Sequence, residues 1–204
     1  MRYLLSAVLC AALCGGPASP VHAVTASPDT DPRMTQAIQR VGDGTWTDAD
    51  LAYIRSDPAV AGAVADPRDE GVSGAETGRT SLAARTSRRL GSCNWWYRAW
   101  FRKRSLLGST LYVYHHKVVY CRTRSRITRV QARPDWWTDP DSVAYWRRLS
   151  DNQLYGTGSG RVYTKKQRHI EFCLVRYGCY QNFYPWIGLT VRANGDHSYR
   201  GSAG

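Results

Sequence analysis

From residue 93 onwards, apolar and polar residues alternate with a period of two, which is the period of a β-strand. The segments that show this pattern are 93–104, 110–121, 126–132, 161–175, 185–193 and 197–200, while 142–149 fits either a strand or a helix. The Asn-Gly pair at 194–195 is a strong hairpin signal. The pattern predicts an all-β domain over 93–204, namely a small antiparallel sandwich or barrel of six or seven strands.

Three short helices are predicted before the strands, over 34–41, 47–55 and 58–65. Thr47 and Asp50 have the spacing of a capping box, and Asp57 precedes a proline at the first helical position. We expect these helices to follow a short disordered stretch in an acidic region, 24–67, whose apolar residues are too few for a stable core alone. The glycine-rich, polar segment 68–92 predicts a linker.

The first 23 residues have the pattern of a signal peptide. An apolar run over 4–14 follows Arg2 and is too short to span a bilayer, and small residues at Val21 and Ala23 suit cleavage after Ala23. An uncleaved N-terminal anchor is the alternative interpretation. No later segment is apolar enough for a transmembrane helix, so we expect a secreted, extracellular mature chain.

Four cysteines follow the predicted cleavage point, and an even number in an oxidising compartment predicts two disulfides. Folding 93–104 back onto 110–121 places Cys93 opposite Cys121, which leaves Cys173 to pair with Cys179. All three connectivities remain open from sequence alone. There is no Cys-x₂-Cys pair and no histidine at zinc-motif spacing, so we expect neither a metal nor a cofactor.

Charge divides the chain into two parts of opposite sign. Residues 24–87 contain six arginines and ten acidic residues, a net charge of −4. Residues 88–204 contain 21 lysines and arginines and six acidic residues, a net charge of +15, together with seven of the eight tryptophans. So large a surplus attracts polyanions, and the candidates outside a cell are anionic wall polymers, acidic glycans and nucleic acid.

The segment 93–104 concentrates tryptophan and arginine on one face of its predicted strand. The predicted hairpin register sets Trp96 opposite Val118, and it sets Arg98, Trp100 and Arg102 opposite His116, Tyr114 and Tyr112, respectively. The candidate ligand-binding residues are therefore Trp96, Arg98, Trp100, Arg102, Tyr112, Tyr114 and His116. If the face is open, its rings and cations suit an anionic ligand. The alternative is that Trp96 and Trp100 pack against a second sheet.

The sharpest enzymatic hypothesis is a nuclease. His169 and Glu171 lie two residues apart on one face of a predicted strand, close in sequence to Lys166 and Arg168, and could supply a general base, a general acid and a cationic cradle. Strand alternation alone generates such pairs, so the solvated face of a charged strand is the simpler interpretation and we favour a non-catalytic role.

We therefore expect a secreted, non-catalytic module that binds anionic surface polymers through the arginine and aromatic side chains. A nuclease or toxin-like enzyme is the first alternative, and a carbohydrate-binding envelope domain that uses tryptophan faces is the second. The acidic region over 24–87 is either a spacer or a mask for the basic domain that is released near Arg88 and Arg89.

One further pattern comes from the motifs LYVYHHKVVYC and EFCLVRYGCYQNFYPWIGLTVRANGDHSY. They combine an aromatic-cysteine strand end, a late Gly-Cys, a proline-led strand and a terminal Asn-Gly turn. Over roughly residues 93–200 this arrangement resembles a group of small secreted proteins of unknown function from high-GC Gram-positive bacteria. The resemblance implies a compact all-β extracellular domain and assigns no functional residues.

Overall fold

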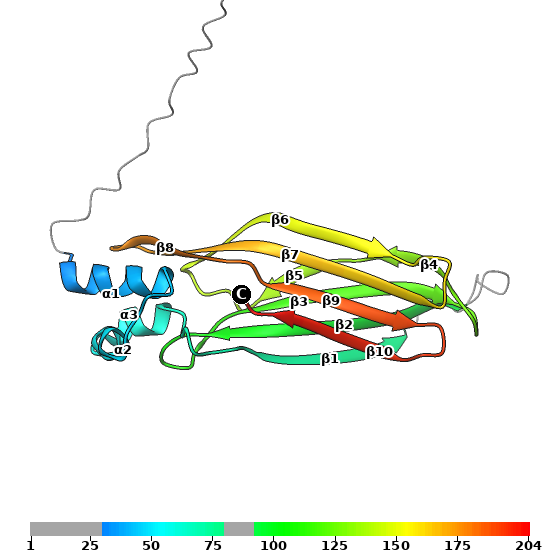
Figure 1. The fold of residues 1–204 in the computed structure, drawn as a ribbon, viewed down its shortest axis with the longest axis horizontal. Coiled ribbons are helices and arrows are strands. Elements are labelled where there is room, and N and C mark those ends of the chain that lie inside the picture. Colours follow the sequence, from blue (N-terminus) through cyan, green and yellow to red (C-terminus); the bar gives the residue numbers. More distant parts are fainter. Residues whose placement is uncertain (1–29, 80–91) are drawn as a thin grey trace, which may run out of the picture.

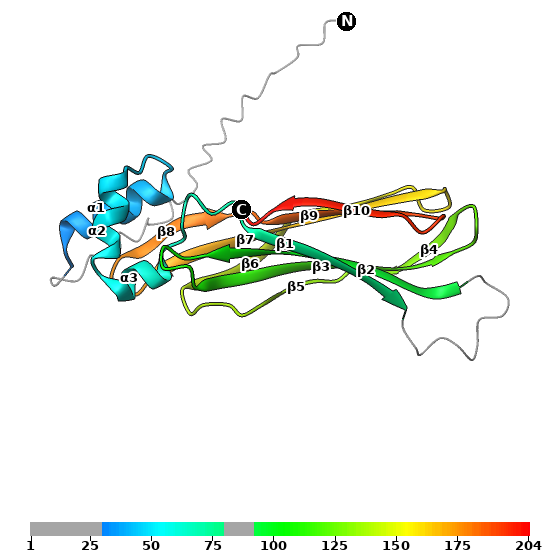
Figure 2. The same ribbon diagram turned by 90° about the horizontal axis from the view of Figure 1, so that it is seen from below.

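The computed structural model describes residues 30–79 and 92–204, in which two antiparallel sheets pack face to face (Figures 1 and 2). The first sheet has the order β1-β2-β3-β4, with β5 also paired to β3, and the second has the order β10-β9-β7-β6, with β8 also paired to β7. The strands of the first sheet are β1 (Val72–Arg79), β2 (Ser92–Arg104), β3 (Thr110–Arg122), β4 (Ile127–Ala132) and β5 (Asp135–Thr138). Those of the second are β6 (Ala144–Tyr155), β7 (Arg161–Leu174), β8 (Gly178–Phe183), β9 (Trp186–Arg192) and β10 (His197–Ser202).

The core lies between the sheets and follows the predicted alternation. Ile170, Phe172 and Leu174 of β7 are all buried, as are every second residue of β9 from Ile187 to Val191. Successive strand residues point to opposite faces, so the intervening residues Glu171 and Cys173 of β7 lie on its outer side and are half-buried, whereas Gly188 and Thr190 of β9 are buried as well. The predicted antiparallel β architecture is thus confirmed, and of the two alternatives, a sandwich and a barrel, the structure has two packed sheets.

The expectation of six or seven strands is wrong, because the described ranges contain ten. The three strands that the pattern did not predict are β1, β5 and β8. β1 contains two glycines and a single large apolar residue, Val72, while β5 has four residues and β8 returns from β7 through a tight turn. β1 also lies within 68–92, the segment predicted to be a linker, and it pairs with β2 along its whole length.

The predicted register of the β2–β3 hairpin is wrong by one residue. Trp96 pairs with Val119, Arg98 with Lys117, and Trp100 with His115. An irregularity between Lys103 and Arg104, beside the hairpin loop, shifts the two strands relative to each other. A slip of one residue moves every partner side chain to the opposite face of the sheet.

The disulfides follow the predicted arrangement only in part. Cys173 and Cys179 are opposed on β7 and β8 and form a disulfide. Cys121 is buried and disulfide-bonded. The side chain of Cys93, its expected partner, lies outside the described part of the chain, so the Cys93–Cys121 pairing remains a prediction.

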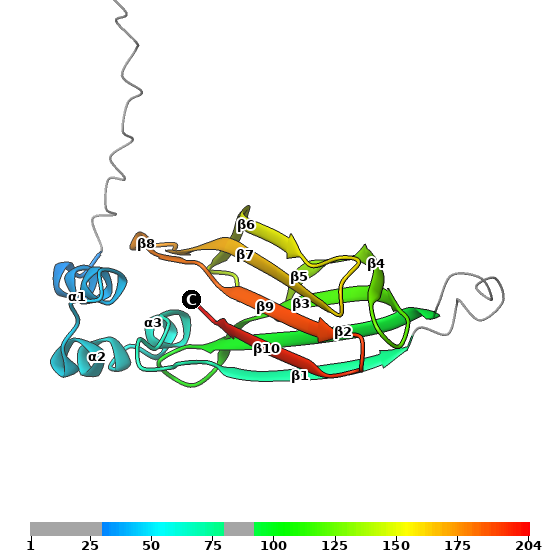
Figure 3. The ribbon, with the colours of Figure 1, turned by 45° about the vertical axis from the view of Figure 1, so that its right-hand side comes forward.

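The three predicted helices are confirmed and lie at one end of the sandwich (Figures 1 and 3). They are α1 (Pro32–Gly42), α2 (Asp48–Arg55) and α3 (Pro58–Ala63). Thr47 and Asp50 form the expected capping box, and Asp57 caps α3. Buried residues of the helices, such as Leu51 and Ile54, belong to the same apolar core as the sheets. None of the described helices is long and apolar enough to cross a membrane.

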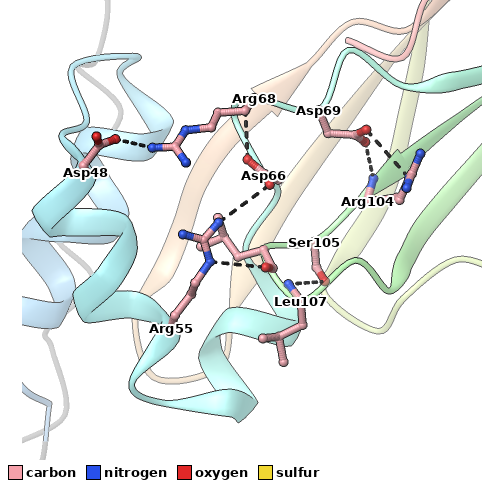
Figure 4. Close-up of polar contacts among 9 residues, drawn as sticks. Asp48, Arg55, Asp66, Arg68, Asp69, Arg104, Ser105 and Leu107 are labelled. Atoms are coloured by element: carbon pink, nitrogen blue, oxygen red, sulfur yellow. Dashed lines mark hydrogen bonds and ion pairs between the residues drawn. The ribbon is translucent and has the colours of Figure 1, made fainter.

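The chain between α3 and β1 fastens the helices to the first sheet (Figure 4). The backbone N–H of Asp66 donates to the carbonyl of Arg104 at 3.0 Å, and the carboxylate of Asp69 accepts from the backbone N–H of Arg104 at 2.9 Å. From the same stretch, Arg68 reaches back to pair with Asp48 at the start of α2. The acidic N-terminal region is therefore tied into the β domain.

Tyr180 of β8 makes a buried polar contact between the two parts. Its hydroxyl accepts a hydrogen bond from the backbone N–H of Ala65 and donates to the carbonyl of Ala63, both at 3.2 Å. Tyr180→Phe leaves these two backbone groups without their partner, so we expect the free energy of unfolding to fall by about 1–3 kcal/mol in denaturant titrations. Tyr145→Phe is the matched control on an exposed tyrosine and is expected to change stability by less than about 0.5 kcal/mol. If both variants lose the same free energy of unfolding, the stabilising role of the Tyr180 hydroxyl is contradicted.

Candidate functional site

The outer surface of the first sheet gathers cations and aromatic rings from β2, β3 and β5. We call this surface the cation–aromatic face, and it consists of Trp96, Arg98, Trp100, Arg102, His115, Lys117 and Trp136. Strand pairing brings these residues together, because β3 lies between β2 and β5 in the sheet. Four of its members are predicted site residues, and the other three come from the observed register.

Trp96 and Trp100 lie across the glycines of β1. Gly74 pairs with Trp100 and Gly78 with Trp96, so both glycines are on the same face as the rings. A Cβ added to Gly78 would lie 2.6 Å from Trp96 Cζ2, and one added to Gly74 would lie 2.7 Å from Trp100 Cζ2. A side chain there would displace the indole, whereas glycine lets each ring rest on the neighbouring backbone. Both tryptophans are half-buried as a result.

Each of three cations on this surface lies over a ring. Lys117 Nζ is 4.6 Å from the centroid of the Trp96 ring, and Arg102 Cζ is 5.7 Å from that of Trp100. Arg98 Cζ is 6.0 Å from the centroid of Trp136. Attraction between a cation and the negative face of a ring holds these long side chains flat against the sheet. The face is therefore a layer of rings beneath a layer of positive charge.

The positive charge on this surface is only partly balanced. Arg98 pairs with Glu76 of β1 at 2.7 Å, but both side chains are substantially exposed, so the pair contributes little to stability. Within the described ranges, neither Arg102 nor Lys117 forms an ion pair with a carboxylate. The two cations are free to pair with an anion from outside.

His115 contributes a neutral ring to the same surface. It stacks on Trp136 with centroids 4.9 Å apart, and its Nε2 lies 3.0 Å from Thr138 Oγ1. Burial first, and the charge of Arg98 second, lower the pKa of His115. It therefore stays uncharged at neutral pH and adds no cation to the face.

Three predicted ligand-binding residues lie in the core instead. Tyr112, Tyr114 and His116 are fully buried, because the one-residue shift of the hairpin turns them inwards. The hydroxyl of Tyr112 donates to the carbonyl of Ala203, and that of Tyr114 donates to Asp135 Oδ2 at 3.3 Å. Their placement on the arginine face is wrong, and they cannot contact a ligand there.

His116 is held in one protonation state by its buried partners. Its Nδ1 lies 3.1 Å from the carbonyl of Pro134, which accepts a hydrogen bond, and its Nε2 lies 3.2 Å from Thr164 Oγ1. These contacts suit a neutral ring that donates from Nδ1 and accepts at Nε2. Burial lowers the pKa of His116 from 6.5 to about 4.

The sequence carried a signal for the two glycines of β1, but not for the three face residues that the prediction missed. Gly74 and Gly78 are four residues apart, as are Trp96 and Trp100, so an antiparallel pairing sets one glycine under each ring. Lys117 and His115 could be assigned to the face only once the register was known. Trp136 lies in the four-residue strand β5, which is too short for a periodicity signal.

The two nuclease candidates, His169 and Glu171, lie on the outer surface of the second sheet, and each contacts a different partner. His169 Nε2 is 2.6 Å from Asn182 Oδ1, and the imidazole stacks on a tyrosine. Glu171 Oε2 accepts from Arg147 Nε at 2.9 Å. Arg168, one of the expected cradle cations, points into the sandwich and pairs with Asp135 at 2.6 Å. The predicted cationic cradle is therefore not assembled around the two candidates.

Metal binding has one geometric candidate among the described residues. Glu171, Cys173 and Cys179 have ligand atoms within 4.8 Å of one another. The two cysteines form a disulfide and so present no thiolate, and a thiolate is the form that binds a metal. Glu171 is itself paired with Arg147, which leaves no ligand set at this position.

Comparisons with protein-family models, curated proteins and solved structures found no match to this chain. The resemblance to small secreted proteins of high-GC Gram-positive bacteria stays a prediction. The site must therefore be interpreted from its own geometry.

The burial of His116 predicts a pH dependence of stability. Its pKa is lower in the folded than in the unfolded chain, so the unfolded chain binds the proton first and stability falls as the pH drops from about 6.5 to about 4. At about 1.4 kcal/mol per unit of pKa difference, the loss from this group is about 3 kcal/mol. Denaturant titrations of the wild type and of His116→Gln between pH 7 and 4 measure it. If the free energy of unfolding depends on pH in the same way in both proteins, the lowered pKa of His116 is contradicted.

Proposed function

We propose that this chain is a non-catalytic binding module that holds anionic polymers on the cation–aromatic face. The observation that carries the proposal is the seating of Trp96 and Trp100 on the glycines of β1 with cations over the rings. This arrangement holds Arg102 and Lys117 in half-exposed positions without a carboxylate partner among the described residues. Fixed cations lose less conformational entropy when an anion binds.

The shape and total charge support an extended partner. The face runs along β2 and β3, each of which spans 13 residues, so it is elongated and lies on the surface of a sheet. The net charge of +15 over 88–204 attracts a polyanion from a distance, and the cations on the face then pair with successive charged groups. A charged chain suits this surface better than a small molecule.

The position of the cations favours an anionic ligand over a neutral glycan. Carbohydrate-binding aromatic rings offer their open faces to sugars, but here Lys117 and Arg102 lie over Trp96 and Trp100. A neutral sugar would have to displace these cations, whereas an anion pairs with them where they are. An anionic polymer is therefore favoured over a neutral carbohydrate as the ligand of this face.

Secretion is part of the proposal. The Cys173–Cys179 disulfide suits an oxidising compartment. The predicted signal peptide, residues 1–23, lies outside the described residues. An extracellular position would bring the basic face into contact with wall polymers, acidic glycans or free nucleic acid, which are the partners that we propose.

The acidic N-terminal region fits a spacer and end cap better than a releasable mask. Its helices contact the end of the sandwich near β8, and β1 is paired along β2. The proposed cleavage near residues 88–89 falls outside the described residues. A cut there would leave β1 and the helices bound to the core by noncovalent contacts, so cleavage alone would not uncover the face.

The test is a salt titration of binding to heparin, to single-stranded DNA and to an uncharged glycan. Binding to the two polyanions should weaken steeply with salt. The double variant Arg102→Gln and Lys117→Gln should weaken it by roughly 10- to 30-fold, at about 1 kcal/mol per cation. It should also reduce the slope of log K against log salt by about two, because about one counterion is released per cation.

The matched control is the double variant Arg148→Gln and Arg200→Gln, which removes the same charge from exposed positions on β6 and β10. It should lose less than about threefold in affinity, because only long-range attraction is reduced. Equal losses in the two double variants would contradict a specific face. Binding of the uncharged glycan that survives high salt would favour the carbohydrate alternative instead.

A further inference from the structure

A second cationic site lies at the end of the sandwich that is farther from the helices, beside the turn between β9 and β10 (Figure 1). It is a cavity of about 340 Å³ between the ends of the two sheets. Its walls include Arg79 of β1, Trp95 of β2, Arg122 at the end of β3, Arg124 just beyond, and Asn194 of the turn. None of these residues belongs to the cation–aromatic face.

Trp95 organises two of the three arginines. Arg79 Cζ lies 3.9 Å from the centroid of the Trp95 ring, and Arg122 Cζ lies 4.0 Å from it. Arg122 Nη1 also donates to the carbonyl of Ala193 at 2.9 Å, which anchors this guanidinium to the turn between β9 and β10. Two like charges are thus held beside the same ring, although repulsion alone would separate them.

The described side chains that line this cavity carry only positive charge, and the neighbouring carboxylate of Asp196 accepts a hydrogen bond from the side-chain amide of Asn194 at 2.6 Å. Among the described residues, the walls of the cavity contain three arginines and no acidic residue. Among the residues that the structure describes, Arg79, Arg122 and Arg124 form no ion pair with a carboxylate. The charge of Arg122 also contributes, after burial, to a lowered pKa of nearby His197. The cavity is therefore a concave region of positive potential.

We propose that this cavity binds a phosphate group carried by a larger molecule. A guanidinium presents paired N–H donors that match the oxygens of a phosphate, and three of them suit its double negative charge. The cavity is larger than one phosphate, which leaves room for the group attached to it. Arg79 and Arg122 already contact the Trp95 ring, so the ring does not serve as a stacking platform for a base or sugar. Recognition would rest on the phosphate itself.

The site is independent of the proposed polymer-binding face, and its experiment separates the two. Inorganic phosphate, glycerol phosphate and a dimethyl phosphate diester are titrated into the whole protein at constant ionic strength set with sodium chloride. The indole N–H signal of Trp95, assigned with Trp95→Phe, reports binding by NMR. We expect saturable binding of inorganic phosphate and of the monoester, and at least tenfold weaker binding of the diester, which carries a single charge.

Arginine variants locate the site. Arg122→Gln and Arg79→Gln should each weaken phosphate binding at least tenfold. Arg124→Gln, at an exposed position with no hydrogen bond to a described residue, tests the same cavity without disturbing the turn and should weaken binding at least threefold. Arg129→Gln removes an exposed arginine of β4 outside the cavity and should change affinity by less than twofold.

The outcomes distinguish this site from the cation–aromatic face. The Arg102→Gln and Lys117→Gln double variant should bind phosphate normally, whether or not it binds polymers. The proposal is overturned if phosphate does not saturate the Trp95 signal. It is also overturned if Arg129→Gln weakens binding as much as Arg124→Gln does, because the effect would then be one of net charge alone.

Discussion

The pairing of β1 with β2 is the contact on which the candidate site depends. β1 brings glycines under two tryptophans of β2, and the absence of a side chain lets the rings lie against its backbone. Because the rings are fixed in this way, Arg102 of β2 and Lys117 of β3 can make cation–π contacts with them. If β1 had residues with larger side chains in place of its glycines, the indoles would be displaced and the cations would lose their contacts with the rings.

The same strand joins the acidic N-terminal region to the basic domain. β1 follows directly from the stretch that fastens the helices to the first sheet, and helix residues share the core with the strands. Opposite charges meet at the seam, as in the ion pairs of Asp69 with Arg104 and of Glu76 with Arg98. The charge asymmetry of the sequence is thus used partly to hold the two regions together, and the surplus positive charge remains elsewhere on the β domain.

Much of the fold could be predicted from local patterns. Period-two alternation located β2, β3, β7 and β9, because long strands with one buried face carry a strong signal, and capping residues located the helices. β1 could not be predicted in this way, since its glycines and polar residues gain their strand conformation from the partner strand. Local pattern also did not reveal the irregularity beside the hairpin loop.

The hairpin irregularity decided how much of the site could be predicted. The face of β2 was assigned correctly, because it depends on alternation within one strand. The residues opposite it on β3 were assigned to the wrong face, because a shift of one residue exchanges Tyr114 for His115 and His116 for Lys117. Pairing between strands is set by loop geometry and long-range packing, and neither can be read from the pattern of a single segment.

Mapping the indole N–H signals during a heparin titration shows whether anionic polymers bind on the cation–aromatic face. We expect the largest chemical-shift changes at Trp96, Trp100 and Trp136. Trp186 is the internal control, because it lies on the second sheet with Lys165 Nζ 5.1 Å from its ring centroid, and its signal should change little. Shifts that are largest at Trp186, or an absence of shifts at the three face tryptophans on binding, would contradict the account.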